Sequence, residues 1–134
     1  MEATSSSIEV WVLGWSVALL VVQIIAQGTA GRDRGTDYLV GPRDEQKSST
    51  NPVAGRLDRA LRNFLETYPA FIALVVALAL TGKTGGIGAT GAVTWIVART
   101  AYVPVYAAGI STLRSLIWFV SIIGLAMMFA RLMF

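Results

Sequence analysis

The stretch VWVLGWSVALLVVQIIAQGTAG, from Val10 to Gly31, contains 22 consecutive residues without a charged side chain. An α-helix of this length spans roughly 33 Å, which is enough to cross a hydrocarbon core of about 30 Å. The residues before it include Glu2 and Glu9 but no Lys or Arg, and the apolar stretch is longer than the core of a typical secretion signal. The sequence therefore predicts a membrane-spanning helix near residues 9–31.

The composition of the whole chain also indicates a membrane protein. Of its 134 residues, 54% are hydrophobic and only 14% are charged, whereas about a quarter of the residues are charged in typical soluble proteins. The absence of Cys and His excludes disulfides, Cys/His metal sites and histidine acid–base chemistry, and we expect no metal. On so apolar a chain, we interpret the net charge of +3 as a signal of membrane topology rather than of nucleic-acid binding.

The charged residues divide the chain into one long loop and further helices. Residues 32–59 carry 11 of the 19 charged side chains, and we predict a polar loop over 32–55. Each uncharged run beyond it is shorter than the roughly 20 residues that a spanning helix needs. We therefore expect the helices to continue through their polar flanks, over 56–81, 86–107 and 112–133. The prediction is a single all-α domain, 1–134, formed as a bundle of four transmembrane helices.

The positive charges are shared unequally between the two sides of this bundle. One side carries Arg32, Arg34, Arg43, Lys47, Arg56, Arg59, Arg62 and the nearby Arg114. The other side carries only Lys83 and Arg131. Because segments rich in Lys and Arg stay in the cytoplasm, we expect the loop 32–55 to be cytoplasmic and both termini to be outside.

Residues 77–84, ALALTGKT, loosely match a phosphate-binding loop. Such a loop follows a strand and opens a helix in an α/β domain, whereas this stretch ends a predicted membrane helix. We therefore interpret it as a turn between two helices. The Gly-rich run that continues to Gly91 is interpreted as small residues for close helix packing.

The second predicted helix carries a group of polar residues on one face. Arg59, Asn63 and Glu66 are spaced at i, i+4 and i+7, and Arg62 can reach Glu66 at i+4. Because an unpaired carboxylate is costly in a membrane, we expect Glu66 to pair with Arg59, Arg62 or Arg99, in the same chain or a neighbouring one. Two interpretations stay open, a structural ion pair or a site whose guanidiniums hold ligand carboxylates.

The third predicted helix repeats this arrangement with Arg99, Tyr102 and Tyr106 at i, i+3 and i+7. Arg114 and Ser115 then begin the fourth helix at a similar depth. The tyrosines are also typical of membrane-interface belts, and Arg114 of positive-inside anchoring. A shared face with an intramembrane arginine favours a pocket as the alternative.

Two stretches carry a resemblance to a known family, RLDRALRNFLETYPAF at 56–71 and ARTAYVPVYAAGISTLRSLIW at 98–118. They resemble the MAPEG family, the membrane-associated proteins in eicosanoid and glutathione metabolism. The family pattern R-A-x-x-N-x-x-E-x-x-P is matched by Arg59, Ala60, Asn63, Glu66 and Pro69. The GPRDE run at 41–45 and the segment PVYAAGI at 104–110 are similar to the bacterial branch in particular. The first predicted helix departs from the pattern. Characterised members place a basic residue toward its end, whereas this chain has Gln23 and Gln27 there and Arg32 slightly later.

The resemblance implies a homotrimer of four-helix bundles in a bacterial inner membrane, with glutathione between neighbouring subunits near the cytoplasmic side. The residues that it places against glutathione are Arg59, Arg62, Asn63, Glu66, Tyr102 and Tyr106. It makes Arg114 the residue that activates the thiol. Arg99 and Ser115 complete the candidate site, Arg99 because it shares a face with both tyrosines and Ser115 as a second donor beside Arg114.

Two functions follow as hypotheses. The first is a glutathione-dependent transferase or peroxidase that acts on lipophilic small molecules arriving from the membrane lipids. The second is a non-catalytic membrane protein of the same fold that binds lipid or acts as a scaffold. A transporter or channel is less favoured, because four short helices show no inverted repeat or pair of broken helices. The sequence does not identify the substrate or the physiological thiol.

Overall fold

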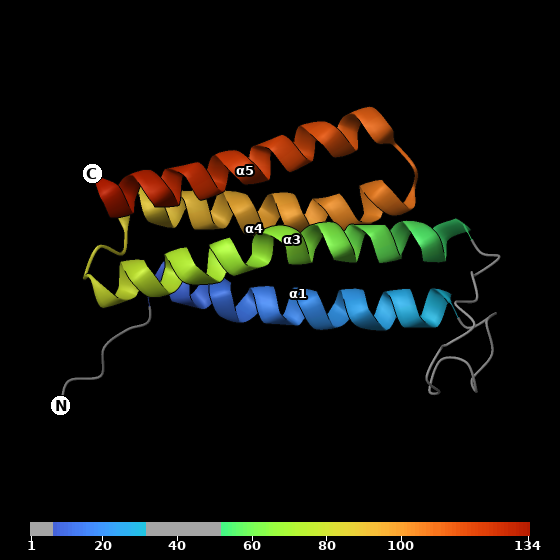
Figure 1. Ribbon diagram of the computed structural model, residues 1–134, viewed down its shortest axis with the longest axis horizontal. Helices are drawn as coiled ribbons and strands as arrows, with labels where there is room; N and C mark the ends of the chain where they lie inside the picture. The colour runs from blue at the N-terminus through green and yellow to red at the C-terminus, as the bar shows by residue number, and fades with distance from the viewer. Residues whose placement is uncertain (1–6, 32–51) are drawn as a thin grey trace.

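The computed structural model describes residues 7–31 and 52–134, and within these ranges it contains four α-helices and no strand. The helices are α1 (Ile8–Ala30), α3 (Pro52–Leu80), α4 (Gly86–Ala107) and α5 (Ser111–Met133). They lie lengthwise beside one another, and each helix runs antiparallel to the helix before it (Figure 1). The predicted all-α helical bundle is confirmed.

Three of these helices, α1, α3 and α5, are long and apolar enough to cross a membrane. The fourth, α4, has a similar length of 22 residues and contains several Gly, Thr and Tyr residues and Arg99; it is not among these three helices. It packs against each of the other three helices, and eight of its residues are buried. The other three helices therefore keep the polar residues of α4 away from lipid, where they would be unfavourable.

The start of α3 differs from the prediction. The helix begins at Pro52, so residues 52–55 belong to α3 and not to the polar loop. Proline is well suited to a first helical turn because its φ is already helical and a backbone N–H is not needed there. The rest of the predicted loop, 32–51, lies outside the described residues. The other helix ends lie within one residue of those expected.

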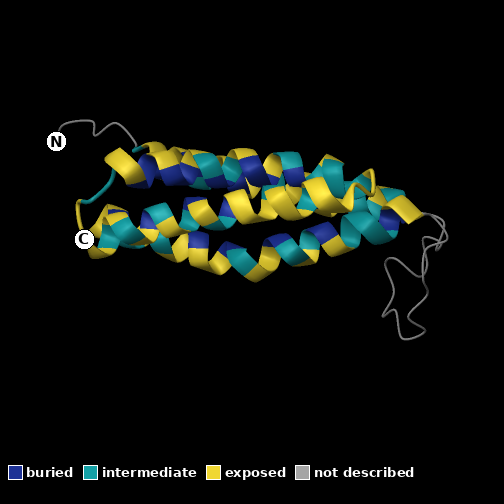
Figure 2. Cartoon of the chain, turned by 90° about the horizontal axis from the view of Figure 1, so that it is seen from above, coloured by how far each residue is buried: buried dark blue, intermediate teal, exposed yellow. Residues whose placement is uncertain are grey.

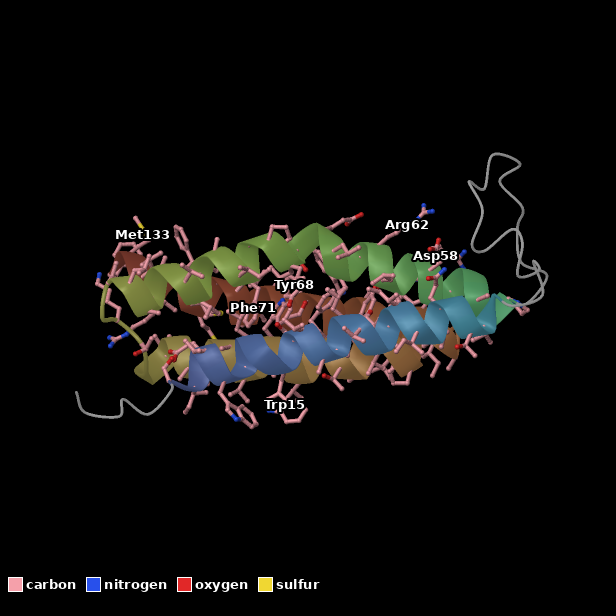
Figure 3. The ribbon with its side chains drawn as sticks, turned by 90° about the horizontal axis from the view of Figure 1, so that it is seen from below. Trp15, Asp58, Arg62, Tyr68, Phe71 and Met133 are labelled. Atoms are coloured by element: carbon pink, nitrogen blue, oxygen red, sulfur yellow. The ribbon has the colours of Figure 1, made fainter. Side chains whose placement is uncertain are left out.

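The core is a stack of aromatic rings between α3 and α4. Phe71 and Trp95 stack with their centroids 3.9 Å apart, and Tyr68 stacks on Trp95 at 6.0 Å. The hydroxyls of Tyr68 and Ser16 share a hydrogen bond of 2.8 Å that joins α1 to this core. In Figure 3, Tyr68 and Phe71 point between the helices while Trp15 points away from the bundle. Figure 2 shows the same division between buried inner and exposed outer faces.

Close packing of α4 on α5 confirms the interpretation of Gly91 as a packing glycine. A Cβ atom at Gly91 would lie 2.6 Å from the carbonyl oxygen of Gly124, and one at Gly124 would lie 2.7 Å from that of Gly91. Neither position can hold a larger residue without moving a backbone. This contact holds α4 close to α5, the two helices that carry Tyr102 and Arg114.

The bundle has two chemically different ends. At the terminal end, where α1 begins and α5 finishes, the turn 81–85 joins α3 to α4. Here Lys83 Nζ donates to the Leu132 carbonyl at 2.8 Å, and Arg131 Nε donates to the Lys83 carbonyl at 2.9 Å. Residues 77–84 therefore end α3 and form a turn, and Lys83 caps the end of α5. The opposite end, where α1 finishes, α3 begins and α4 connects to α5, is called the loop end below.

Candidate functional site

A cavity of about 430 Å³ opens between α3, α4 and α5 at the loop end. The residues that line it are Arg59, Arg62, Asn63, Glu66, Tyr102, Tyr106, Arg114, Ser115 and Trp118. Eight of the nine residues expected in the candidate site are thus brought together, although they come from three helices. The ninth, Arg99, lies behind the cavity wall.

Helix geometry explains the α3 side of the cavity. Arg59, Asn63 and Glu66 recur at helical spacing, so their side chains leave the helix on one side. The α4 side is formed by Tyr102 and Tyr106, whose rings meet edge to face with centroids 5.5 Å apart. These two tyrosines are one turn apart, and α4 continues through Pro104 without ending.

The α5 side begins at a sharp turn. Gly109 adopts a φ of 77°, a left-handed conformation that favours glycine, and α5 starts at Ser111. Arg114 is therefore in the first turn of α5, where the helix dipole adds positive potential. Its guanidinium carbon lies 4.8 Å from the ring centroid of Tyr106. This contact draws the charge of Arg114 toward the cavity.

Tyr106 also contacts Arg59 of α3. Nε of Arg59 donates to the Tyr106 hydroxyl at 3.3 Å, and the Arg59 guanidinium carbon lies 5.9 Å from the same ring. One tyrosine thus contacts guanidiniums from both α3 and α5. Because the aromatic face is partly negative and the hydroxyl accepts hydrogen bonds, Tyr106 keeps two positive groups at the same edge of the cavity.

Arg99 supports the cavity from the core. Its side chain is 1% exposed, and its Nη1 donates to Oδ1 of Asn63 at 2.8 Å. The guanidinium carbon lies 4.4 Å from the ring centroid of Tyr102 and 5.6 Å from that of Phe64. Arg99 therefore contacts two lining residues, but it does not itself face the cavity. Its predicted contact with a ligand stays a prediction.

The expected ion pair of Glu66 is absent from the chain described here. Among residues 7–31 and 52–134, no Lys or Arg nitrogen lies within 4.0 Å of the Glu66 carboxylate. Arg62 pairs with Asp58 instead, at 3.2 Å, and both side chains project outward from α3 in Figure 3. Arg99 is held by Asn63. Within one chain the expected pair does not form, because Arg62 and Arg99 have other partners. A partner on a neighbouring copy stays a prediction.

Two further residues at this end were not included in the expected site. Trp118 lines the cavity, and its spacing of i+4 from Arg114 could have placed it on the same face of α5. Arg56 donates from Nη1 to the Ala107 carbonyl at 3.2 Å and so ties α3 to the end of α4. By contrast, Gln23 of α1 is 2% exposed in the interior and does not line the cavity.

The lining has the chemistry of a site for an anionic ligand that also carries amide or amine groups. Three arginines and one glutamate line it, so the lining carries a net positive charge. Guanidiniums bind carboxylates through paired hydrogen bonds, while Asn63 and Glu66 offer amide and carboxylate groups. No group of three or more potential metal-binding side chains occurs in the described part of the chain.

The fold and the site define a class of protein, an integral membrane bundle of four helices with a cationic cavity near one end. Residues 10–134 match the MAPEG family, which is nearly the whole chain. The chain belongs to this family. No curated protein and no solved structure matches it.

Proposed function

We propose that this protein is a glutathione-dependent transferase or peroxidase that acts on lipophilic electrophiles from the bilayer. The observation that carries the proposal is the cavity of about 430 Å³. It unites three arginines with two tyrosines, an asparagine and a glutamate at one end of a membrane bundle. Membership of the MAPEG family supports a membrane protein of this family, without specifying the reaction.

The α3 side of the cavity suits the tripeptide. Glutathione carries two carboxylates, an ammonium group and two amides, so it needs both cationic and anionic partners. We assign Arg59 and Arg62 to its carboxylates, and Asn63 and Glu66 to its amide and ammonium groups. Glu66 suits the ammonium group because its carboxylate has no cationic partner among the described residues.

The α5 side suits the sulfur. A thiol with a pKa near 8.5 is mostly protonated at neutral pH, and the thiolate is the nucleophile. The chain has no His or Cys, so positive charge and hydroxyl donors must stabilise the thiolate. Arg114 combines a guanidinium with the N-terminal end of α5, and Ser115 is the next available donor. We therefore assign thiol activation to Arg114.

We further propose that the working protein is a homotrimer in a bacterial inner membrane, with glutathione between neighbouring copies and the loop end in the cytoplasm. Glu66 stands at the middle of α3 and is exposed, which is unfavourable against lipid. Leu65 and Val76, 45% and 43% exposed, are apolar residues on the outside of the same helix. A neighbouring copy would cover both the polar and the apolar residues of α3.

A second candidate function is non-catalytic lipid binding, and a separate groove favours it. The groove has a volume of about 630 Å³ and is lined mainly by apolar residues of α4 and α5. Two of its described lining residues have hydroxyls, and both are satisfied by backbone: Thr90 donates to the Gly86 carbonyl and Thr94 to the Thr90 carbonyl. A hydrocarbon chain fits such a surface. In the first proposal, the same groove would serve a lipophilic electrophile.

Titration calorimetry of the purified protein with glutathione in detergent tests the first proposal. We expect saturable binding that Arg62→Ala weakens, and conjugation of a model lipophilic electrophile by the wild type. Lys83→Ala at the terminal end is the matched control, because it also removes one positive charge but far from the cavity. Absence of glutathione binding by the folded wild type would contradict the proposal and leave the lipid-binding function.

A further inference from the structure

A second, smaller cavity lies beside the first at the loop end. Its volume is about 170 Å³, and it is lined by Arg56, Arg59, Tyr106, Gly109, Ile110 and Arg114. Three guanidiniums therefore share a small space, and none of the six described lining residues is acidic. Asp58, which lies between Arg56 and Arg59 in the sequence, pairs with Arg62 instead.

Each guanidinium is held at this cavity by its own contact. Arg56 is fixed by its hydrogen bond to the Ala107 carbonyl and lies against Gly109, where a Cβ atom would approach its guanidinium carbon to 3.0 Å. Arg59 is fixed through Nε on the Tyr106 hydroxyl, and Arg114 lies over the Tyr106 ring. These contacts leave further N–H groups of the guanidiniums available as donors.

The start of α5 adds to the positive potential. Its N-cap residue is Ile110, which makes no side-chain hydrogen bond to the first turn. The first N–H groups of a helix lack partners within the helix and favour an anion. Like charges gathered in a small cavity repel one another unless an anion balances them. The cavity is therefore suited to a small anion that has several hydrogen-bond acceptor oxygens.

We propose that this cavity binds a phosphate group, of the kind carried by an anionic membrane phospholipid. Phosphate has enough acceptor oxygens for three arginines, and the guanidinium fork matches its geometry. Basic pockets between transmembrane helices at the cytoplasmic side are suited to phospholipid head groups. Free phosphate shares this chemistry, so the two sources have to be separated by experiment.

The surroundings of the cavity favour the lipid as the source. Ile110 lines the cavity and is 48% exposed, and Leu113 and Leu116 on the following turns are 42% and 61% exposed. These side chains offer an apolar path next to the cavity, which a phospholipid tail can follow and free phosphate cannot use. The two cavities share Arg59, Tyr106 and Arg114, whereas Arg56, Gly109 and Ile110 line only the smaller one. The tests below therefore use Arg56, whose substitution removes no residue from the lining of the larger cavity.

Native mass spectrometry of the protein with added lipid tests the proposal without glutathione. The protein in detergent receives equal amounts of phosphatidylglycerol and phosphatidylcholine, whose head groups differ in net charge. We expect preferential retention of phosphatidylglycerol, reduced about ten-fold by Arg56→Gln, which corresponds to about 1.4 kcal/mol. Arg62→Gln is the matched control, because it removes the same charge from the same helix but outside this cavity. Arg62→Gln should change lipid retention by no more than about two-fold, which is a smaller change than the loss of a hydrogen bond to a charged group would cause.

A second arm separates the two sources of phosphate. The unfolding temperature is compared in inorganic phosphate and in chloride at equal ionic strength, for the wild type and Arg56→Gln. Protection of the wild type alone by phosphate, without preference for phosphatidylglycerol, would support the site and assign it to free phosphate. Absence of both effects, or equal effects in Arg56→Gln and Arg62→Gln, would overturn the proposal. If Arg56→Gln does not fold, Arg56→Lys replaces it, since it keeps the charge but loses the fork.

Discussion

Nη1 of Arg99 donates a hydrogen bond of 2.8 Å to Oδ1 of Asn63, across the contact between α4 and α3. The bond determines which way the Asn63 amide faces, because its oxygen is directed to Arg99 and its NH₂ group is left for the cavity. The buried guanidinium also packs on Tyr102. A residue outside the cavity thus orients two residues that line it.

This bond predicts strong coupling between the two positions. In a double-mutant cycle of Arg99→Met and Asn63→Ala, we expect a coupling energy of about 1.5–3 kcal/mol in the free energy of unfolding, the usual range for a hydrogen bond to a charged group. Denaturation in detergent provides the measurement. The control cycle combines Arg99→Met with Lys83→Met at the opposite end, where the effects should add. Additive effects in both cycles would contradict the structural role of the bond.

The contact of Gly91 with Gly124 predicts a large effect from a single methyl group. A Cβ atom at Gly91 would lie 2.6 Å from a backbone oxygen, so Gly91→Ala must separate α4 from α5 and should cost about 1–3 kcal/mol. Gly14→Ala on α1 is the control, because no heavy atom lies within 4 Å of its new methyl group. The thermal unfolding temperature in detergent should fall only for Gly91→Ala. Equal unfolding temperatures for the two variants would show that α4 and α5 do not pack closely at Gly91.

A third prediction concerns the terminal end, where Glu9 is fully buried. Its Oε1 accepts from the Gly85 N–H at 2.7 Å and so caps α4, whose own N-cap residue has no side chain. Glu9→Ala leaves this N–H without its acceptor and should cost about 1–3 kcal/mol. Glu9→Gln retains an acceptor but loses the charge at the helix N-terminus, so its loss should be smaller. Chemical denaturation of the three proteins is the measurement, and a stable Glu9→Ala variant would disprove the cap.

Sequence periodicity accounts for most of the candidate site. Charge-free runs indicated the helices, and spacing put Arg59, Asn63 and Glu66 on one side of α3 before the structure placed them on one cavity. Antiparallel order then brings the end of α4 and the start of α5 to the same end of the bundle. These results follow from helix geometry, which the sequence determines locally.

Contacts between helices could not be predicted in the same way. Arg99 shares a face with Tyr106 by spacing, yet its guanidinium lies in the core against Asn63. Glu66 was expected to pair with an arginine, and Glu9 was treated only as a charge before the first helix, although it caps α4. Such partners depend on the rotation and relative shift of neighbouring helices, which a repeat within one helix does not specify.

The orientation in the membrane gives a fourth prediction. Because the chain has no Cys, single substitutions can be labelled without a background signal. In intact cells, a membrane-impermeant maleimide should label Phe134→Cys, which replaces a residue 99% exposed at the terminal end. It should not label Ala108→Cys, at the exposed connection between α4 and α5, until the membrane is opened. The reverse pattern would invert the predicted topology.

The last prediction separates binding of the thiol from its activation. Arg114 touches the Tyr106 ring from the first turn of α5, whereas Arg62 belongs to the α3 side of the cavity. If Arg114 stabilises the thiolate, Arg114→Ala should keep glutathione affinity within a few-fold, because one charge in three is lost, yet remove the ultraviolet thiolate signal of the complex and most conjugation. Arg62→Ala should do the opposite, with weaker binding and a full thiolate signal once the site is saturated. Arg114→Lys, which retains the charge without the fork, should recover part of the signal. A full thiolate signal and turnover in Arg114→Ala would show that another group, with Ser115 the first candidate, activates the sulfur.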